Sequence, residues 1–224
     1  MDNTLTPEAL LAGVRRTRLL AIVRGTDGAA AARAALAAME EGFHYVEIAL
    51  TTPGALEAIS EVRAAAPAGS FVGAGTVLTK QDVDGVALAG GQFMVTPSLA
   101  PSIEEAAGRG FGVLAGALTP SEALEAMRRG ATAVKLFPAS IGGPGYLKAL
   151  RDPFPEIPFI AVGGVGLDEA AGYWDAGAIA AGLGGPLFGD AASGGDLAPM
   201  RERARRFVTL AGGYDSQAGS GDRR

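Results

Sequence analysis

Short apolar runs alternate with longer amphipathic stretches along most of the chain. Each run contains four or five residues, rich in Val, Ile, Leu, Phe and Ala, which is typical of strands covered on both faces of a parallel sheet. The predicted strands span residues 19–23, 45–49, 71–74, 93–96, 112–115, 133–137, 158–162 and 179–183.

The stretches between these runs are rich in Ala, Leu, Glu and Arg, which favour the helical conformation. The predicted helices span residues 29–41, 54–65, 80–89, 103–109, 120–129, 146–150 and 168–175. A glycine follows the last apolar position of several of them, as expected where a helix ends. These glycines are Gly42, Gly90, Gly110, Gly130 and Gly177. Thr6-Pro7-Glu8 marks the start of a further, N-terminal helix, predicted over residues 4–16.

The order of these elements predicts an α/β fold with a parallel sheet. Eight strand–helix units favour a closed (β/α)₈ TIM barrel with an extra N-terminal helix, because open doubly wound sheets typically use about five or six strands. We expect a single domain over residues 1–211. The polar, Gly- and Ser-containing residues 212–224 are predicted to form a flexible tail.

Composition excludes several classes of protein. With 48% hydrophobic residues the chain is not disordered, and without cysteine it has no disulfide scaffold. With His44 as the single histidine and no cysteine, a conventional zinc site is not expected. We also expect no other metal and no cofactor. The net charge of −5 argues against a nucleic-acid-binding face. The acidic start of the chain and the lack of a long apolar run predict a cytoplasmic protein without a membrane partner.

Two charged residues interrupt the apolar strands. Lys135 lies in the sixth strand, and burial of an ammonium group commonly lowers its pKa and provides a nucleophilic amine. The alternative is a lysine that extends from the strand end into solvent. Glu47 lies in the second strand, as half of a buried ion pair or as a general acid/base. Since strands two and six face each other across such a barrel, both side chains could reach one substrate.

Further polar and glycine positions fall where strands end. Arg24 closes the first strand, where it could bind a substrate carboxylate, pair with Glu47, or do both. Thr76 follows the third strand and would place its hydroxyl at the same mouth. Glycine pairs follow the seventh and eighth strands, in the two loops that commonly bind phosphate in these barrels. They are Gly163-Gly164 and Gly184-Gly185.

From about residue 19 to residue 189, the chain resembles the 2-keto-3-deoxy-6-phosphogluconate/2-keto-3-deoxy-6-phosphogalactonate aldolase family of class I aldolases. The family's motifs occur in order as Val46-Glu47-Ile48, Gly73-Ala74-Gly75-Thr76-Val77, Val95-Thr96-Pro97, Lys135-Leu136-Phe137-Pro138, Val162-Gly163-Gly164-Val165 and Gly182-Leu183-Gly184-Gly185. The resemblance implies a homotrimeric barrel that cleaves a phosphorylated keto-deoxy sugar acid to pyruvate and glyceraldehyde 3-phosphate without a metal.

The resemblance also implies a role for each matching residue. Lys135 would form the Schiff base and Glu47 would transfer protons. The remaining substrate contacts would come from Arg24, Thr76, Thr96, Pro97 and Phe137. The phosphate would lie on Gly163, Gly164, Gly184 and Gly185.

Some positions depart from the family pattern. Thr51 stands where many phosphogluconate-cleaving members have an arginine that helps to bind the carboxylate, and Gly185 replaces a frequent serine. Val162 resembles the phosphogalactonate-cleaving members, so we expect that epimer to be preferred. Two alternatives remain. One is cleavage of 4-hydroxy-2-oxoglutarate, and the other is a non-catalytic barrel that binds a phosphate ligand.

Overall fold

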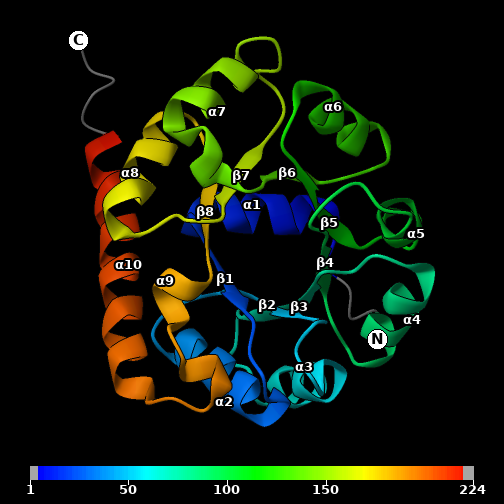
Figure 1. Ribbon diagram of the computed structural model, residues 1–224, viewed down its shortest axis with the longest axis vertical. Coiled ribbons are helices and arrows are strands. Elements are labelled where there is room, and N and C mark those ends of the chain that lie inside the picture. The colour runs from blue at the N-terminus through cyan, green and yellow to red at the C-terminus, as the bar shows by residue number, and fades with distance from the viewer. Residues whose placement is uncertain (1–4, 219–224) are drawn as a thin grey trace.

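Eight parallel strands close into a barrel, in sequence order, in the computed structural model of the chain (Figure 1). The structure describes residues 5–218, with side chains for residues 5–214. The strands are β1 (Leu19–Val23), β2 (Tyr45–Ala49), β3 (Phe71–Gly75), β4 (Phe93–Val95), β5 (Gly112–Ala117), β6 (Ala133–Leu136), β7 (Phe159–Val162) and β8 (Ala180–Leu183). Because β1 pairs with both β2 and β8, the sheet has no open edge. The predicted TIM barrel is confirmed.

Helices surround the barrel and close one of its ends (Figure 1). They are α1 (Pro7–Thr17), α2 (Gly28–Glu40), α3 (Ala55–Ala65), α4 (Lys80–Leu88), α5 (Ser102–Gly108), α6 (Pro120–Arg128), α7 (Gly143–Arg151), α8 (Leu167–Asp175), α9 (Gly185–Phe188) and α10 (Leu197–Ala218), with 3₁₀ turns η1 (Ala139–Ile141) and η2 (Ala191–Ser193). Within residues 5–218, none of these helices combines the length and the apolar character needed to cross a lipid bilayer.

The sequence determines where these helices begin and end. Thr79 and Thr119 accept hydrogen bonds from the third residue of α4 and α6, and an acidic residue at that position returns the bond to the cap. All five glycines predicted to end helices have a positive φ, between 81° and 104°, which other residues rarely adopt.

The N-terminal helix closes one end of the barrel. Thr6 caps α1 and Pro7 is its first residue, as predicted. Leu10 and Val14 are fully buried and pack against the side chains inside the barrel, including Leu114. Gly13 lies directly against Tyr45, where a Cβ would come within 1.6 Å of the tyrosine oxygen. The barrel floor is therefore filled by side chains.

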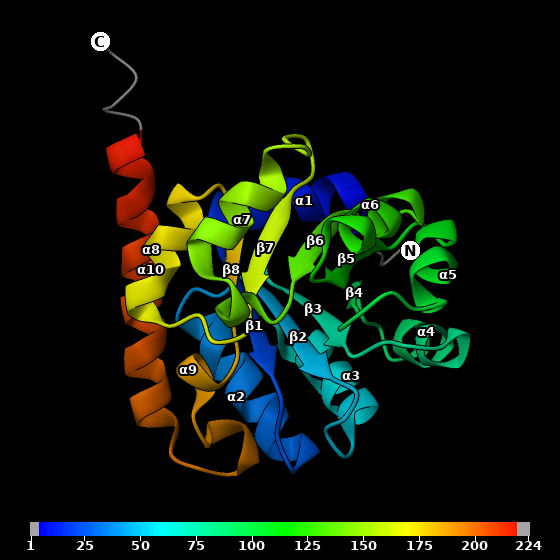
Figure 2. The same cartoon turned by 45° about the horizontal axis from the view of Figure 1, so that its top comes forward.

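The C-terminal region differs from the sequence-based expectation. No helix is predicted there, but α10 begins at Leu197 and packs against α2 and α8 on one side of the barrel (Figure 2). The predicted tail starts at residue 212, whereas α10 continues through Ala218, and Tyr214 in this stretch packs edge-on against Trp174 and donates to the Asp175 Oδ1 over 2.8 Å. The rest of the predicted tail, residues 219–224, lies outside the described residues. Other element ends shift by one to three residues.

Candidate active site

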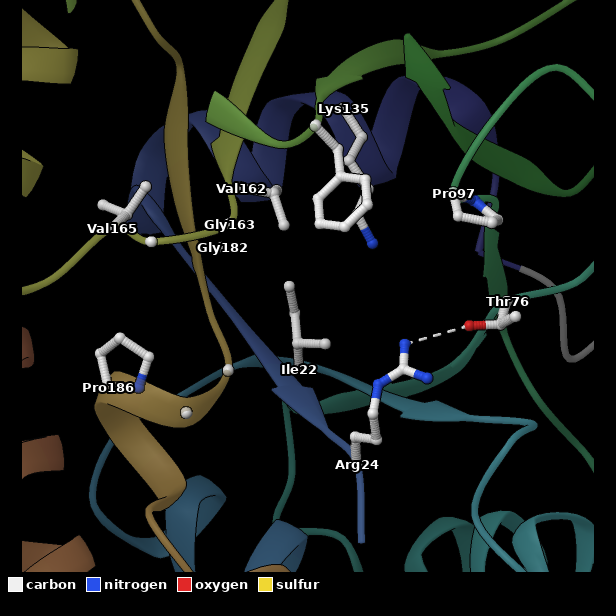
Figure 3. A pocket seen from close by; sticks show the side chains of 14 residues that line it. Ile22, Arg24, Thr76, Pro97, Lys135, Val162, Gly163, Val165, Gly182 and Pro186 are labelled. Atoms are coloured by element: carbon white, nitrogen blue, oxygen red, sulfur yellow. Dashed lines mark hydrogen bonds between the residues drawn. The ribbon is translucent and has the colours of Figure 1, made fainter. Parts of the chain in front are cut away.

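A cavity of about 480 Å³ opens where the strands end at their carboxyl side (Figure 3). Nine of the eleven residues predicted for the site line it: Arg24, Thr76, Pro97, Lys135, Phe137, Gly163, Gly164, Gly184 and Gly185. Five lining residues were not predicted to contact substrate: Ile22, Val162, Val165, Gly182 and Pro186. Their inward position follows from strand alternation, but an apolar residue in an apolar strand carries no sequence signal of its own.

The centre of the site is an ion pair between opposite strands. The Lys135 Nζ of β6 lies 3.2 Å from the Glu47 Oε1 of β2, and the two side chains are 8% and 1% exposed. The alternative of a lysine that extends into solvent is therefore wrong. The Glu47 Oε2 is buried and has no hydrogen-bond partner among the described residues, so it remains available to a substrate hydroxyl or a proton.

A glycine of the neighbouring strand makes room for this pair. Gly75 ends β3 beside Glu47, and a Cβ there would lie 2.6 Å from the Glu47 Oε1. At the end of the same strand as the lysine, the Phe137 ring has its centre 5.7 Å from the Lys135 Nζ, a distance at which a cation interacts with the aromatic face. Gly75 and the planar Phe137 ring thus leave the amine accessible while the Glu47 carboxylate stays fixed beside it.

Arg24 approaches the amine from the opposite wall of the cavity (Figure 3). Its Nη2 donates to the Thr76 hydroxyl over 3.3 Å, and its Nη1 donates to the Thr51 hydroxyl. Glu47 is not its partner, so the predicted Arg24–Glu47 pair is not formed. Thr76 has a φ of 58°, an uncommon backbone conformation for a β-branched residue, and such positions concentrate at functional sites.

The two glycine pairs lie together on the far side of the cavity. Gly163 and Gly164 have φ values of 94° and 75°, and a Cβ on Gly164 would come within 2.7 Å of Ser140. Within residues 5–218, the N–H groups of Gly164 and Gly185 donate to no other residue. Exposed backbone N–H groups without a side chain above them can bind the oxygens of a phosphate.

Thr96 occupies a different place from the one predicted. Its side chain is 1% exposed and does not line the cavity. The hydroxyl donates to the Ser98 carbonyl over 2.7 Å and accepts from the Gly116 N–H over 3.1 Å. Both bonds hold the loop that carries Pro97 into the cavity wall. Thr96 therefore positions a wall residue without lining the cavity itself.

Aromatic side chains pack below the ion pair. Tyr45 stacks on Phe71, with ring centres 5.4 Å apart, and contacts Phe93 edge-on. Burial raises the pKa of the Tyr45 hydroxyl, so it stays neutral at physiological pH.

Among the described residues, no group of three His, Cys, Asp or Glu side chains is arranged to hold a metal ion.

Comparison with known proteins identifies the family. A family model described as "Aldolase: KDPG and KHG aldolase" matches residues 11–200. The chain belongs to this aldolase family. A protein of Rhizobium meliloti, named probable 2-dehydro-3-deoxy-6-phosphogalactonate aldolase, is 39% identical over 203 residues, which are 90% of this chain and 93% of the relative.

Two further comparisons agree. The 2-dehydro-3-deoxy-6-phosphogalactonate aldolase of Escherichia coli is 38% identical over 85% of this chain and 92% of its own length. A solved structure described as native KDPGal superposes with a TM-score of 0.82 and 36% identity, covering 88% of this chain and 96% of that one. This aldolase therefore matches its relatives over nearly their whole length.

Proposed function

We propose that this aldolase cleaves 2-dehydro-3-deoxy-6-phosphogalactonate to pyruvate and D-glyceraldehyde 3-phosphate through a Schiff base on Lys135. One observation carries the proposal. The Lys135 Nζ lines a cavity that has a cation on one wall and free backbone N–H groups on another, and it lies 3.2 Å from the Glu47 carboxylate, which is buried behind the cavity wall. The reaction requires a reactive amine, a group that carries protons, and a binding site for the anionic group at each end of the substrate.

The reaction begins at the keto carbon of the substrate. The Lys135 ammonium gives a proton to Glu47, and its neutral Nζ then attacks C2 to form a carbinolamine. Glu47 returns that proton to the carbinolamine hydroxyl, which leaves as water and gives a protonated imine. The C4 hydroxyl then transfers its proton to Glu47, the C3–C4 electron pair moves toward the imine nitrogen, and the aldehyde departs. Glu47 returns the proton to C3 of the remaining enamine. Water adds to the imine carbon, pyruvate leaves, and the amine is regenerated.

The other side chains of the cavity would fix the two ends of the substrate. Arg24 and Thr76 would bind the pyruvyl carboxylate, a charge-assisted contact. Pro97 and Phe137 would contact the substrate carbons, and Thr96 would act on it only through the Pro97 loop. At the other end, the phosphate would accept hydrogen bonds from the paired glycines after β7 and β8.

Val162 favours the galactonate epimer. It lines the cavity next to the first glycine pair, and it offers no hydrogen bond to a substrate hydroxyl. The two relatives named above carry the phosphogalactonate name. We expect faster pyruvate release from the phosphogalactonate substrate than from its phosphogluconate epimer when the two are assayed side by side.

Borohydride trapping tests the mechanism. Reduction in the presence of pyruvate should leave a covalent adduct on Lys135, located by peptide mass spectrometry. Lys135→Met should form no adduct and release no pyruvate, whereas Lys148→Met, which removes an exposed lysine on α7, should behave as the parent does. An adduct on another lysine, or an active Lys135→Met variant, would refute the proposal. Phosphate-ester binding without cleavage of any keto-deoxy phosphosugar would indicate a non-catalytic barrel.

The assembly and the compartment are parts of the same proposal. The family resemblance implies a homotrimer, which native mass spectrometry would detect as three chains. A phosphorylated sugar acid carries charges that do not cross a lipid bilayer unaided, so its enzyme is expected in the cytoplasm, where such compounds are retained.

A further inference from the structure

The loop after β2 holds a residue that the proposed mechanism does not use. Thr51 is exposed and lies outside the cavity wall, yet its hydroxyl accepts a hydrogen bond from the Arg24 Nη1. The second terminal nitrogen of the same guanidinium donates to Thr76. Arg24 is therefore held at two points, by threonines that follow two different strands.

The partners of Arg24 leave its charge uncompensated. No carboxylate of the described residues lies within 4.0 Å of it, whereas Arg109 contacts Asp84 and Glu105 at 2.7 and 2.6 Å. A neutral hydroxyl accepts a hydrogen bond without neutralising the cation. The guanidinium is thus oriented while its full charge remains available to an anionic ligand.

Arg24 has enough unused N–H groups to bind such a ligand. A guanidinium has five N–H groups in one plane, of which the two threonine hydroxyls occupy two. Three remain, and a carboxylate can accept two of them in parallel. An arginine without these anchors loses the freedom of several torsions when it binds, and this loss weakens the binding of its ligand.

We propose that Thr51 is a positioning residue that orients Arg24 for the carboxylate of the substrate. The inference rests on the proposed function, since it takes Arg24 as the carboxylate-binding group. Thr51 stands where a second arginine occurs in many similar aldolases. In this chain one arginine, fixed by a neutral neighbour, replaces two cations.

The test compares two substitutions at an exposed position. Thr51→Val keeps the shape of the side chain and removes the hydroxyl, whereas Thr51→Ser keeps the hydroxyl. Thr51→Val should raise the KM for pyruvate in the direction of carbon–carbon bond formation by about five- to tenfold, which is within the usual range for the loss of one hydrogen bond. Its kcat should stay within about twofold, and Thr51→Ser should restore the parental KM.

Two further measurements separate positioning from a structural effect. Inorganic phosphate, used as an inhibitor competitive with glyceraldehyde 3-phosphate, should bind all three proteins equally, because the proposed phosphate site lies on the glycine loops. The melting temperatures should agree within about 2 °C. An unchanged pyruvate KM in Thr51→Val, an equal defect in Thr51→Ser, or a parallel loss of phosphate binding would overturn the inference. A parent protein that forms no adduct with pyruvate would instead refute the proposed function.

Discussion

At the scale of single residues, the site is built from charged groups buried in an apolar environment. Lys135 and Glu47 are charged residues in apolar strands, and the structure places them 3.2 Å apart inside the barrel. The cost of burying each charge is reduced because the other lies beside it. The geometry is therefore sensitive to residues that touch either side chain.

Gly75→Ala tests this sensitivity. The added methyl group would lie 2.6 Å from the Glu47 Oε1, so the carboxylate must move away from its position beside Lys135. We expect kcat to fall by about 10- to 100-fold, because a displacement near 1 Å has that effect on catalytic groups. Gly108→Ala, which adds a methyl group where nothing lies within 4 Å, is the control and should retain full activity. Equal activity of the two variants would contradict the prediction.

Gly185 offers a test in the opposite direction. A Cβ at this position would have no atom within 4 Å, so the serine that is frequent in the family fits without strain. Gly185→Ser should lower the KM for the phosphorylated substrate several-fold by adding a hydroxyl donor to a charged ligand. Gly185→Ala, measured in the same assay, should leave that KM unchanged, and a similar fall in both variants would show that the hydroxyl has no role.

At the scale of elements, caps position the helices around the barrel. Thr119 and Glu122 begin α6 with a capping box, in which the Glu122 carboxylate accepts from the N–H groups of Leu118 and Thr119 at 2.9 and 2.8 Å. These two hydrogen bonds hold the pKa of Glu122 below its usual value of 4.5. Thr119→Ala should destabilise the fold by about 1 kcal/mol.

The lowered pKa of Glu122 predicts a pH dependence. A group whose pKa is lower in the folded state stabilises the fold above its unfolded pKa, and this contribution is lost as the pH falls through the folded value. Urea unfolding should therefore show Glu122→Gln to be less stable than the parent at pH 7, with the difference shrinking below about pH 4.5. A constant difference from pH 7 to pH 3.5 would argue against the assigned cause.

Much of the element order could be predicted from the sequence. The alternation of apolar runs and the glycines that end helices are local signals, and the barrel follows from their number. The contact between Lys135 and Glu47 was also predictable, because each is an exception within its own strand. The Arg24–Thr51 contact was not, because it depends on how two loops approach each other. Helix α10 was missed because its many arginines obscure a buried face.

At the scale of the whole molecule, α1 completes the core at the floor of the barrel. Leu10 is fully buried there, and its Cδ2 lies within 2.5 Å of the place that a Cβ on Gly112 would occupy. Leu10→Ala should cost about 2–5 kcal/mol of unfolding free energy, since the rigid barrel cannot fill the space. Leu88→Ala, at a leucine that is 90% exposed on α4, should change stability by less than about 0.5 kcal/mol. Urea unfolding of both variants would decide the matter.

The closed floor also determines how substrates and products enter and leave the site. With one end of the barrel filled, everything that reaches Lys135 must enter and leave through the mouth lined by exposed Gly164 and Gly185. In the proposed mechanism, the triose phosphate lies across this exit while pyruvate is still bonded to the amine. We expect the two products to depart in a fixed order, triose phosphate first. After the triose phosphate leaves and before pyruvate does, the enamine of pyruvate on Lys135 faces the open mouth. A different aldehyde can then enter and form a carbon–carbon bond with it.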